Sequence, residues 1–264
     1  SIKGFENILC YHSPVVVFEI DGILYYLDPN EKQHTIFAGS LKERGSLRNL
    51  FQRAGSTMPD KLFQIFMGEI TEENEIKASV FLKLGGRYIS SFNSEEFEDI
   101  LIKNYQLYGY DSIEVKTGYF KYGHAAIERN LEINSGKTKS AGAGMILVKL
   151  PYPPESLINS NLTLNQAERD TPLEMGKKIN EEYEYEFNLP ENLVFAQDNR
   201  SLEVVNNLGK TISTIEAADG KIKIYRKIYI DKKRIQPEDY HYYRELMTAW
   251  LDKYFQTIYL KEKK

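Results

Sequence analysis

Three residue types that together can build a thiol nucleophile occur near the start of the chain. Cys10 is the single cysteine of the sequence, His12 follows two residues later, and Asp28 lies further on. In cysteine enzymes a histidine takes the thiol proton and a carboxylate orients the histidine. Cys10 lies in an apolar, strand-like stretch with no helix start before it and nothing basic beside it, so nothing there favours a reactive thiolate. We therefore expect Cys10 to be a buried structural thiol.

The other histidines do not suggest a metal centre. His34, His124 and His241 lack the spacing of ligands that share one helix face. A single cysteine also excludes an internal disulfide and any zinc site with several thiolates. We predict no metal and no cofactor for this chain.

Neighbouring carboxylates are the next residues that could do acid–base chemistry. They occur as Glu72 and Glu73, Glu95 and Glu96, and Glu181 and Glu182. Each pair falls in a predicted turn, a first helical turn or a strand entry, where solvated charge is ordinary, so we expect all of them at the surface. Residues 136–144 are rich in glycine but match neither GxxxxGK(S/T) nor GxGxxG, the spacings of phosphate-binding loops. They predict a hairpin.

Composition indicates a folded chain and argues against two classes of partner. Of the 264 residues 42% are hydrophobic and 12% aromatic, too many for a disordered chain. The net charge of −4 gives no basic field for nucleic acid. No run of residues reaches the roughly 20 apolar positions of a membrane helix, so we expect no membrane-spanning segment. The start at Ser1, without methionine or signal peptide, suggests a chain trimmed from a longer one.

The elements that must position any site divide near residue 60. Residues 15–29 predict a β-hairpin around Asp21 and Gly22, with near-continuous apolar arms that need cover on both faces. A short helix is possible around residues 47–51. Beyond residue 60 the pattern changes to many short strands, so we expect residues 1–60 and 61–264 to be separate domains.

The second part predicts strands and two helices. Asn93 and Glu96 form a capping box ahead of an apolar face of Phe97, Ile100 and Leu101. A later amphipathic helix starts at Pro237 and runs to Tyr254. Strands are expected at residues 63–69, 75–84, 112–117, 126–133, 144–150, 183–189, 211–216, 222–230 and 257–260. This is a mainly β, α+β chain, and we expect an antiparallel β-sandwich-like domain with two helices.

Nineteen tyrosines make the aromatic content unusual. Exposed tyrosines on a sheet can stack on sugars or anchor a partner. Tyr183 and Tyr185, however, alternate with glutamates as residues of a core-facing strand do, and Tyr240, Tyr243 and Tyr254 lie on one helix face. We expect core packing, with glycan binding as the alternative.

Several motifs together resemble one family. They are Asp21-Gly22 with Tyr26-Leu27-Asp28-Pro29; Tyr183-Glu184-Tyr185-Glu186-Phe187-Asn188-Leu189-Pro190; Asn207-Leu208-Gly209; and Ile235-Gln236-Pro237-Glu238-Asp239-Tyr240 with Arg244. The first resembles the last strands of the papain-like core of transglutaminase-like proteins. The others resemble the C-terminal domain of unknown function that follows this core in multidomain, mostly secreted, Bacteroidota-type proteins of Gram-negative bacteria.

The resemblance implies an incomplete catalytic core in residues 1–60. Asp28 matches the orienting aspartate of the family, and His12 matches its histidine loosely, because the family position falls nearer Ser13. The family nucleophile lies well upstream of the histidine, so His12 and Asp28 would be a vestigial or partial site. The resemblance also implies a periplasmic or cell-envelope location.

We therefore predict a non-catalytic accessory or interaction domain of a transglutaminase-like cell-envelope protein. Its partner would be the upstream portion of the same protein or another envelope protein, with a glycan or peptide as a possible ligand. One alternative is a carbohydrate-binding β-sandwich module. The other is part of a cysteine transglutaminase or protease whose nucleophile lies outside this chain, so the sequence leaves enzymatic activity undecided.

Overall fold

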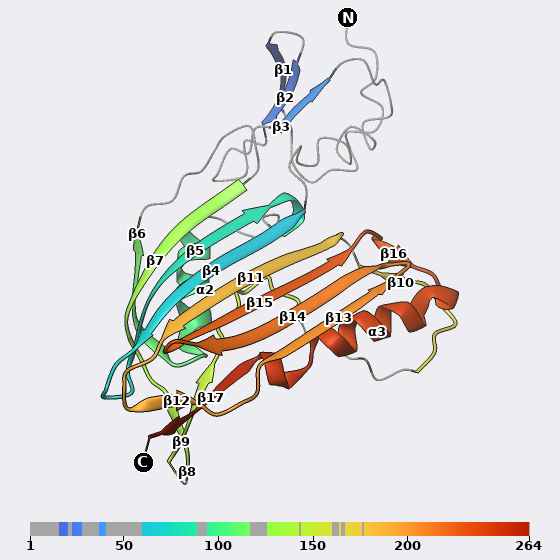
Figure 1. Cartoon of the computed structure of the whole chain (residues 1–264). Helices are drawn as coiled ribbons and strands as arrows, with labels where there is room; N and C mark the ends of the chain where they lie inside the picture. The colour runs from blue at the N-terminus through green and yellow to red at the C-terminus, as the bar shows by residue number, and fades with distance from the viewer. Residues whose placement is uncertain are drawn as a thin grey trace, which may run out of the picture.

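The computed structural model describes residues 16–20, 23–27, 37–40 and 60–263, apart from residues 89–93, 117–125, 143, 160–163, 165–166 and 176. Figure 1 shows that strands dominate this part of the chain. Two α-helices, α2 (Ser94–Gln106) and α3 (Tyr240–Trp250), occur among the described residues. The expected mainly β chain with two helices is confirmed.

The strands of the predicted N-terminal hairpin are present. β1 (Val16–Ile20) and β2 (Ile23–Leu27) pair antiparallel, and Ile20 lies opposite Ile23, as a two-residue connection requires. β3 (Phe37–Ser40) extends this sheet along β2. The turn itself and the short helix predicted around residues 47–51 lie outside the described residues, and the domain boundary near residue 60 stays a prediction.

One eight-stranded sheet organises the rest of the chain. In spatial order it consists of β13 (Arg200–Asn206), β14 (Gly209–Ala218), β15 (Lys221–Ile230), β11 (Ile179–Asn188), β4 (Lys61–Ile70), β5 (Ile76–Gly85), β7 (Ala126–Gly136) and β6 (Tyr110–Lys116). Strands from residues 61–136 and from residues 179–230 therefore share one hydrogen-bonded layer.

The middle of this sheet contains a parallel junction. β4 and β11 run parallel with Leu62 opposite Glu181, whereas the other neighbouring pairs of this sheet are antiparallel. The antiparallel sheet expected from the strand pattern thus consists of two antiparallel four-stranded halves joined by one parallel seam. Alternating side chains look alike in parallel and antiparallel strands, so the sequence could not reveal the seam.

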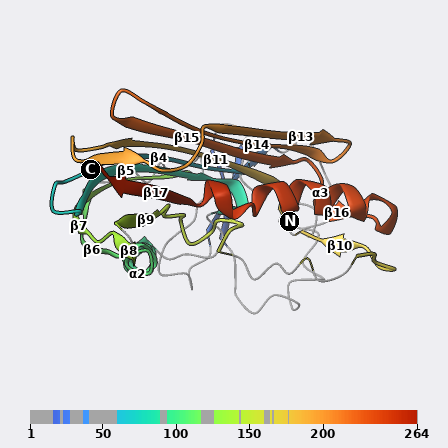
Figure 2. The same ribbon diagram turned by 60° about the horizontal axis from the view of Figure 1, so that its bottom comes forward.

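Figure 2 shows what covers one face of the large sheet. α2, α3 and a four-stranded sheet lie beneath it, while the opposite face of the large sheet has no described layer upon it. The small sheet has the order β12 (Leu193–Phe195), β17 (Thr257–Glu262), β9 (Met145–Lys149) and β8 (Lys139–Gly142). A short pair, β10 (Leu173–Glu174) and β16 (Arg234–Ile235), lies near α3. The core is the space between these layers.

The two helices largely follow the predicted faces. In α2, Phe97, Leu101 and Tyr105 are fully buried, but Ile100 is 37% exposed, so its predicted place on the apolar face is wrong. The buried stripe follows four-residue steps, which leaves Ile100 beside it. α3 follows a 3₁₀ turn at Pro237–Asp239, and the next turn, Lys253–Phe255, is again 3₁₀.

Glycine is needed at two positions of the large sheet, one in a turn and one where two strands approach closely. Asp219 and Gly220 both have positive φ, 51° and 72°, as the tight hairpin between β14 and β15 demands. Gly209 serves close packing instead, since a Cβ atom there would lie 1.8 Å from the backbone oxygen of Tyr229 on β15. Gly209 therefore lets β14 begin against the end of β15.

We predict that Gly209→Ala lowers the free energy of unfolding by about 3 kcal/mol, because backbone atoms must move apart to admit the methyl group. Urea denaturation followed by circular dichroism measures the change. Glu216→Ala, an exposed site on the same strand, is the control and should stay within about 0.5 kcal/mol of the parent. Equal stability of the Gly209→Ala variant and the parent would contradict the close approach.

Candidate functional site

The residues predicted to be catalytic lie outside the described part of the chain. This holds for His12 and Asp28, so their roles as a vestigial or partial site stay predictions, and Cys10, which was expected to be a structural thiol, also lies outside the described residues. Within the described residues, no three of the His, Cys, Asp and Glu side chains cluster so as to hold a metal ion. The described helices are also too short or too polar to cross a membrane.

The most unusual buried feature is a connection that crosses the covered face of the large sheet. Residues 151–157, between β9 and β10, have no regular structure, yet Tyr152, Ser156 and Leu157 are buried. Buried backbone groups outside helices and strands need side-chain partners. Gln64 Nε2 and the Tyr185 hydroxyl both donate to the Pro151 carbonyl, at 3.0 and 2.9 Å. β4 and β11 thus fix the start of this connection.

A buried arginine fixes Tyr152, the next residue of this connection. Arg226 on β15 has no exposed surface, and its guanidinium donates to the Ser213 hydroxyl at 3.2 Å and to the Tyr152 hydroxyl and the Trp250 carbonyl. The guanidinium carbon also lies 4.3 Å from the ring centroid of Trp250. No carboxylate pairs with Arg226 among the described residues. Its charge is instead compensated by neutral oxygens and an aromatic face.

A buried glutamate fixes the end of the connection. Glu181 on β11 has no exposed surface and accepts from the Leu157 N–H at 2.9 Å and from the Tyr183 and Tyr88 hydroxyls at 2.8 and 3.2 Å. The Ser156 hydroxyl donates to the same carboxylate at 3.3 Å. Burial raises the pKa of Glu181 above its ordinary value, although the hydrogen bonds from Tyr183 and Leu157 oppose the shift.

Two tyrosines lie between these charged groups. The rings of Tyr152 and Tyr183 meet edge to face with centroids 5.1 Å apart, Tyr152 bound to Arg226 and Tyr183 to Glu181. Burial raises the pKa of Tyr152, even though the nearby Arg226 charge acts in the opposite direction. These tyrosines therefore stay protonated at neutral pH and serve as hydrogen-bonding links.

This cluster contradicts one expectation from the sequence and confirms another. Glu181 was expected at the surface with Glu182, but it is buried. It precedes Tyr183 by two positions, so the strand period places it on the inward face, a signal already present in the sequence. Arg226 was visible only as a break in the apolar side of residues 222–230. The stacked tyrosines Tyr183 and Tyr185 are buried, which confirms the expectation of core packing.

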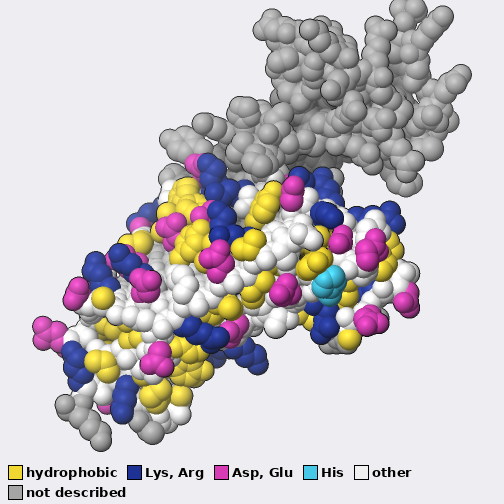
Figure 3. Space-filling view, turned by 45° about the vertical axis from the view of Figure 1, so that its right-hand side comes forward, with side chains coloured by type: hydrophobic (Ala, Val, Ile, Leu, Met, Phe, Trp, Pro, Cys, Tyr) yellow, Lys and Arg dark blue, Asp and Glu magenta, His cyan; other side chains and the backbone are white. Residues whose placement is uncertain are grey.

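The neighbouring Glu182 points to the open face and behaves in the opposite way. It pairs with Lys61 of β4 at 3.2 Å and with Lys227 of β15 at 3.4 Å, and accepts from the Tyr225 hydroxyl at 3.0 Å. Partial burial alone would raise the pKa of Glu182, but these partners outweigh it and lower the pKa. On the face of the described residues that Figure 3 shows, charged side chains are interspersed with hydrophobic ones.

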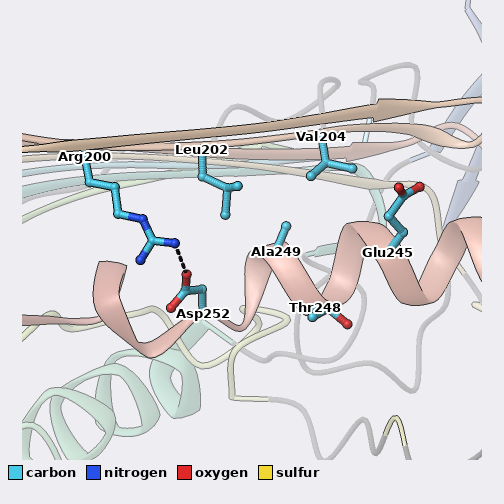
Figure 4. Close-up of a pocket in the computed structure, with 7 residues that line it drawn as sticks. All are labelled: Arg200, Leu202, Val204, Glu245, Thr248, Ala249 and Asp252. Atoms are coloured by element: carbon cyan, nitrogen blue, oxygen red, sulfur yellow. Dashed lines mark ion pairs between the residues drawn. The ribbon is translucent and has the colours of Figure 1, made fainter.

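The described surface also contains a groove between the edge strand β13 and α3. Its volume is about 620 Å³, and Figure 4 shows its seven lining residues. They are Arg200, Leu202, Val204, Glu245, Thr248, Ala249 and Asp252. Arg200 and Asp252 form an ion pair of 3.4 Å at one end, and Glu245 lies at the other. The groove could not be foreseen from the sequence, because no strand was predicted at residues 200–206.

Comparisons with known proteins found one matching family model and a similar solved structure. A family model named DUF3858, described as a domain of unknown function with a solved structure, matches residues 145–260. The crystal structure of a candidate protease from Parabacteroides distasonis ATCC 8503 is similar, with 20% identity and a TM-score of 0.41. That similarity covers 46% of this chain and 24% of the other. No curated protein matches the sequence.

The match places a domain of unknown function where the C-terminal motifs lie. Residues 183–190, 207–209 and 235–240 all fall within the matched range. A domain of unknown function is therefore supported for residues 145–260, and its place behind a transglutaminase-like core stays a prediction. At this identity and TM-score, the structural likeness says nothing about activity.

We predict opposite pH dependences for two neighbouring variants. Because the folded pKa of Glu181 is raised, its carboxyl group loses stabilising effect as the pH rises from the ordinary value of about 4.3 through the folded pKa. The difference in free energy of unfolding between the parent and Glu181→Gln should therefore fall with rising pH. For Glu182→Gln it should increase with rising pH, because the folded pKa of Glu182 is lowered.

Urea denaturation of the parent and both variants from about pH 2 to 8 measures both differences, because the Glu182 contribution changes below the ordinary carboxyl pKa of about 4.3 and the Glu181 contribution changes above it. Slopes of the same sign would contradict the buried and exposed placements of these two carboxylates.

We predict that Arg226→Lys lowers the free energy of unfolding by about 3 kcal/mol, since one ammonium group cannot reach all three acceptors. Trp250 is the only tryptophan, so its fluorescence reports on the cluster during urea denaturation. Lys223→Met, which removes an exposed cation from the same strand, is the control and should cost less than about 1 kcal/mol. Similar losses in both variants would show that Arg226 is not a structural anchor.

Proposed function

We propose that this chain is a non-catalytic accessory domain of a transglutaminase-like cell-envelope protein, and that it binds protein. The partner is the upstream portion of the same protein or another envelope protein. The groove between β13 and α3 is the observation that carries this proposal, because it offers an apolar floor beside a strand whose outer edge pairs with no other described strand.

The interior supports a structural role for its polar groups. Arg226 and Glu181 are the charged residues that a search for chemistry would single out, since both are fully buried. Within the described part of the chain, they form hydrogen bonds with residues 151–157, β11, β14, Tyr88 and the end of α3. Groups used in this way hold the layers together.

The family context comes from the sequence motifs and the matched domain. Residues 145–260 match a domain of unknown function. The sequence around Asp28 resembles the aspartate context of a transglutaminase-like core. The cell-envelope location is part of this proposal and follows from that resemblance. A carbohydrate-binding role has less support, because Tyr183, Tyr185, Tyr240 and Tyr243 are buried.

We predict no amine transfer to a glutamine-containing protein and no peptide hydrolysis by the chain of residues 1–264. The reason is that no basic residue adjoins its single cysteine in the sequence, so nothing there favours a reactive thiolate. Release of ammonia and cleavage of a fluorogenic peptide are measured for the parent and for Cys10→Ser. Turnover that Cys10→Ser abolishes would refute the accessory role and favour an enzyme built on Cys10, His12 and Asp28.

A further inference from the structure

The edge strand β13 has an unused hydrogen-bonding side. β13 pairs with β14 through residues 200–206, and on its other side it meets no strand among the described residues. In an antiparallel pair, every second residue directs its N–H and C=O away from the partner. An extended peptide can add to such an edge as a further strand.

α3 places a shelf below this edge. Glu245, Thr248, Ala249 and Asp252 recur at three- and four-residue steps, so they share one face of the helix and the turn that follows. Tyr243, Leu246, Met247 and Trp250 face the core instead. Figure 4 shows Leu202 and Val204 pointing from β13 toward this shelf. A strand added beside β13 would direct every second side chain into the same groove.

The charges along the groove select the occupant. Arg200 is already engaged, since it pairs with Asp252 at 3.4 Å and lies 4.8 Å from the ring centroid of Tyr254. Glu245 accepts one hydrogen bond from Asn206 Nδ2 at 2.9 Å, and no cation pairs with it among the described residues. One positive and two negative side chains therefore leave the lining with a single unbalanced negative charge, at the Glu245 end.

We infer that this groove binds an extended peptide segment with two apolar residues at alternate positions and a lysine or arginine two positions beyond them. The apolar side chains lie over Leu202, Val204 and Ala249, and the cation meets Glu245. This inference rests on the proposed role as a protein-binding domain, and it specifies the chemistry of the partner.

A second copy of the chain fits the edge less well. Two β13 strands that pair antiparallel about their midpoint place Glu203 opposite Glu203, and like charges directly opposite each other destabilise a sheet. A peptide with a basic residue has no such conflict and also neutralises Glu245. The groove thus favours a basic, alternating segment of another polypeptide.

Labelled peptides test the inference with the intact chain. The probes are Val-Thr-Val-Ser-Lys for parallel addition and Lys-Ser-Val-Thr-Val for antiparallel addition, with fluorescence anisotropy as the readout. We expect one of them to bind. Methylation of alternate peptide nitrogens should abolish binding when the methylated N–H groups face β13 and leave it intact when they face solvent.

A charge reversal locates the site. Glu245→Lys should weaken binding of the lysine peptide about tenfold and strengthen binding of the matching glutamate peptide. Glu216→Lys reverses an exposed charge on β14 outside the groove and should change neither affinity. Hydrogen exchange of the β13 amides should slow when peptide is bound, and Trp250 fluorescence confirms that each variant is folded.

The possible failures are distinguishable. Peptide binding that Glu245→Lys leaves unchanged, or no binding at millimolar peptide, would overturn the inference. If the chain also shows no amine transfer and no peptide hydrolysis, the accessory role stands. Dimerisation with protected β13 amides would show that a second copy is the occupant, and would also overturn it. Turnover that depends on Cys10 would refute the accessory role whatever the peptides do.

Discussion

A buried positive charge that pairs with no carboxylate of the described residues is the constraint on which the covered side of this protein depends. The guanidinium of Arg226 must satisfy its donors inside the protein, because an unpaired buried charge is far more costly than a lost surface contact. Its acceptors come from β14, from the connection after β9 and from the last turn of α3. Three separate parts of the chain therefore meet at one side chain.

The position of α3 follows from this constraint. Arg226 bonds to the carbonyl of Trp250 and stacks on its ring, so the C-terminal end of the helix is held against the sheet. Nearer the start of α3, Asn206 Nδ2 of β13 donates hydrogen bonds to the Tyr242 carbonyl and to the Glu245 carboxylate. With both regions held, the helix runs below the edge strand at a fixed spacing. The groove is thus a consequence of buried polar bonds as well as of apolar packing.

Glu181 plays the matching part at the other side of the same connection. Its carboxylate accepts four different donors, including a backbone N–H that no helix or strand would satisfy. A polar network of this kind specifies one arrangement of the chain, because any shifted arrangement leaves buried donors unpaired.

The sequence predicted elements better than their assembly. Alternation around Tyr183, Tyr185 and Phe187 predicted β11, and Asp219 with Gly220 predicted the turn that the structure contains. The same two-residue period assigns Glu181 to the inward face, yet the general preference of glutamate for water was given more weight. Pattern carries no information on which strands become neighbours, so the parallel seam and the β13 groove were not foreseen.

The parallel seam also joins two halves of the large sheet, and within each half most neighbouring strands are close together in the sequence. On one side β4, β5, β7 and β6 follow nearly in chain order, and on the other β13, β14 and β15 are joined by short hairpins. Leu62 and Glu181, however, are 181 − 62 = 119 positions apart. Closing a loop of that size costs roughly 4 kcal/mol of chain entropy. We expect each half to form through local contacts, and the joining of the halves to set the pace at which the protein folds.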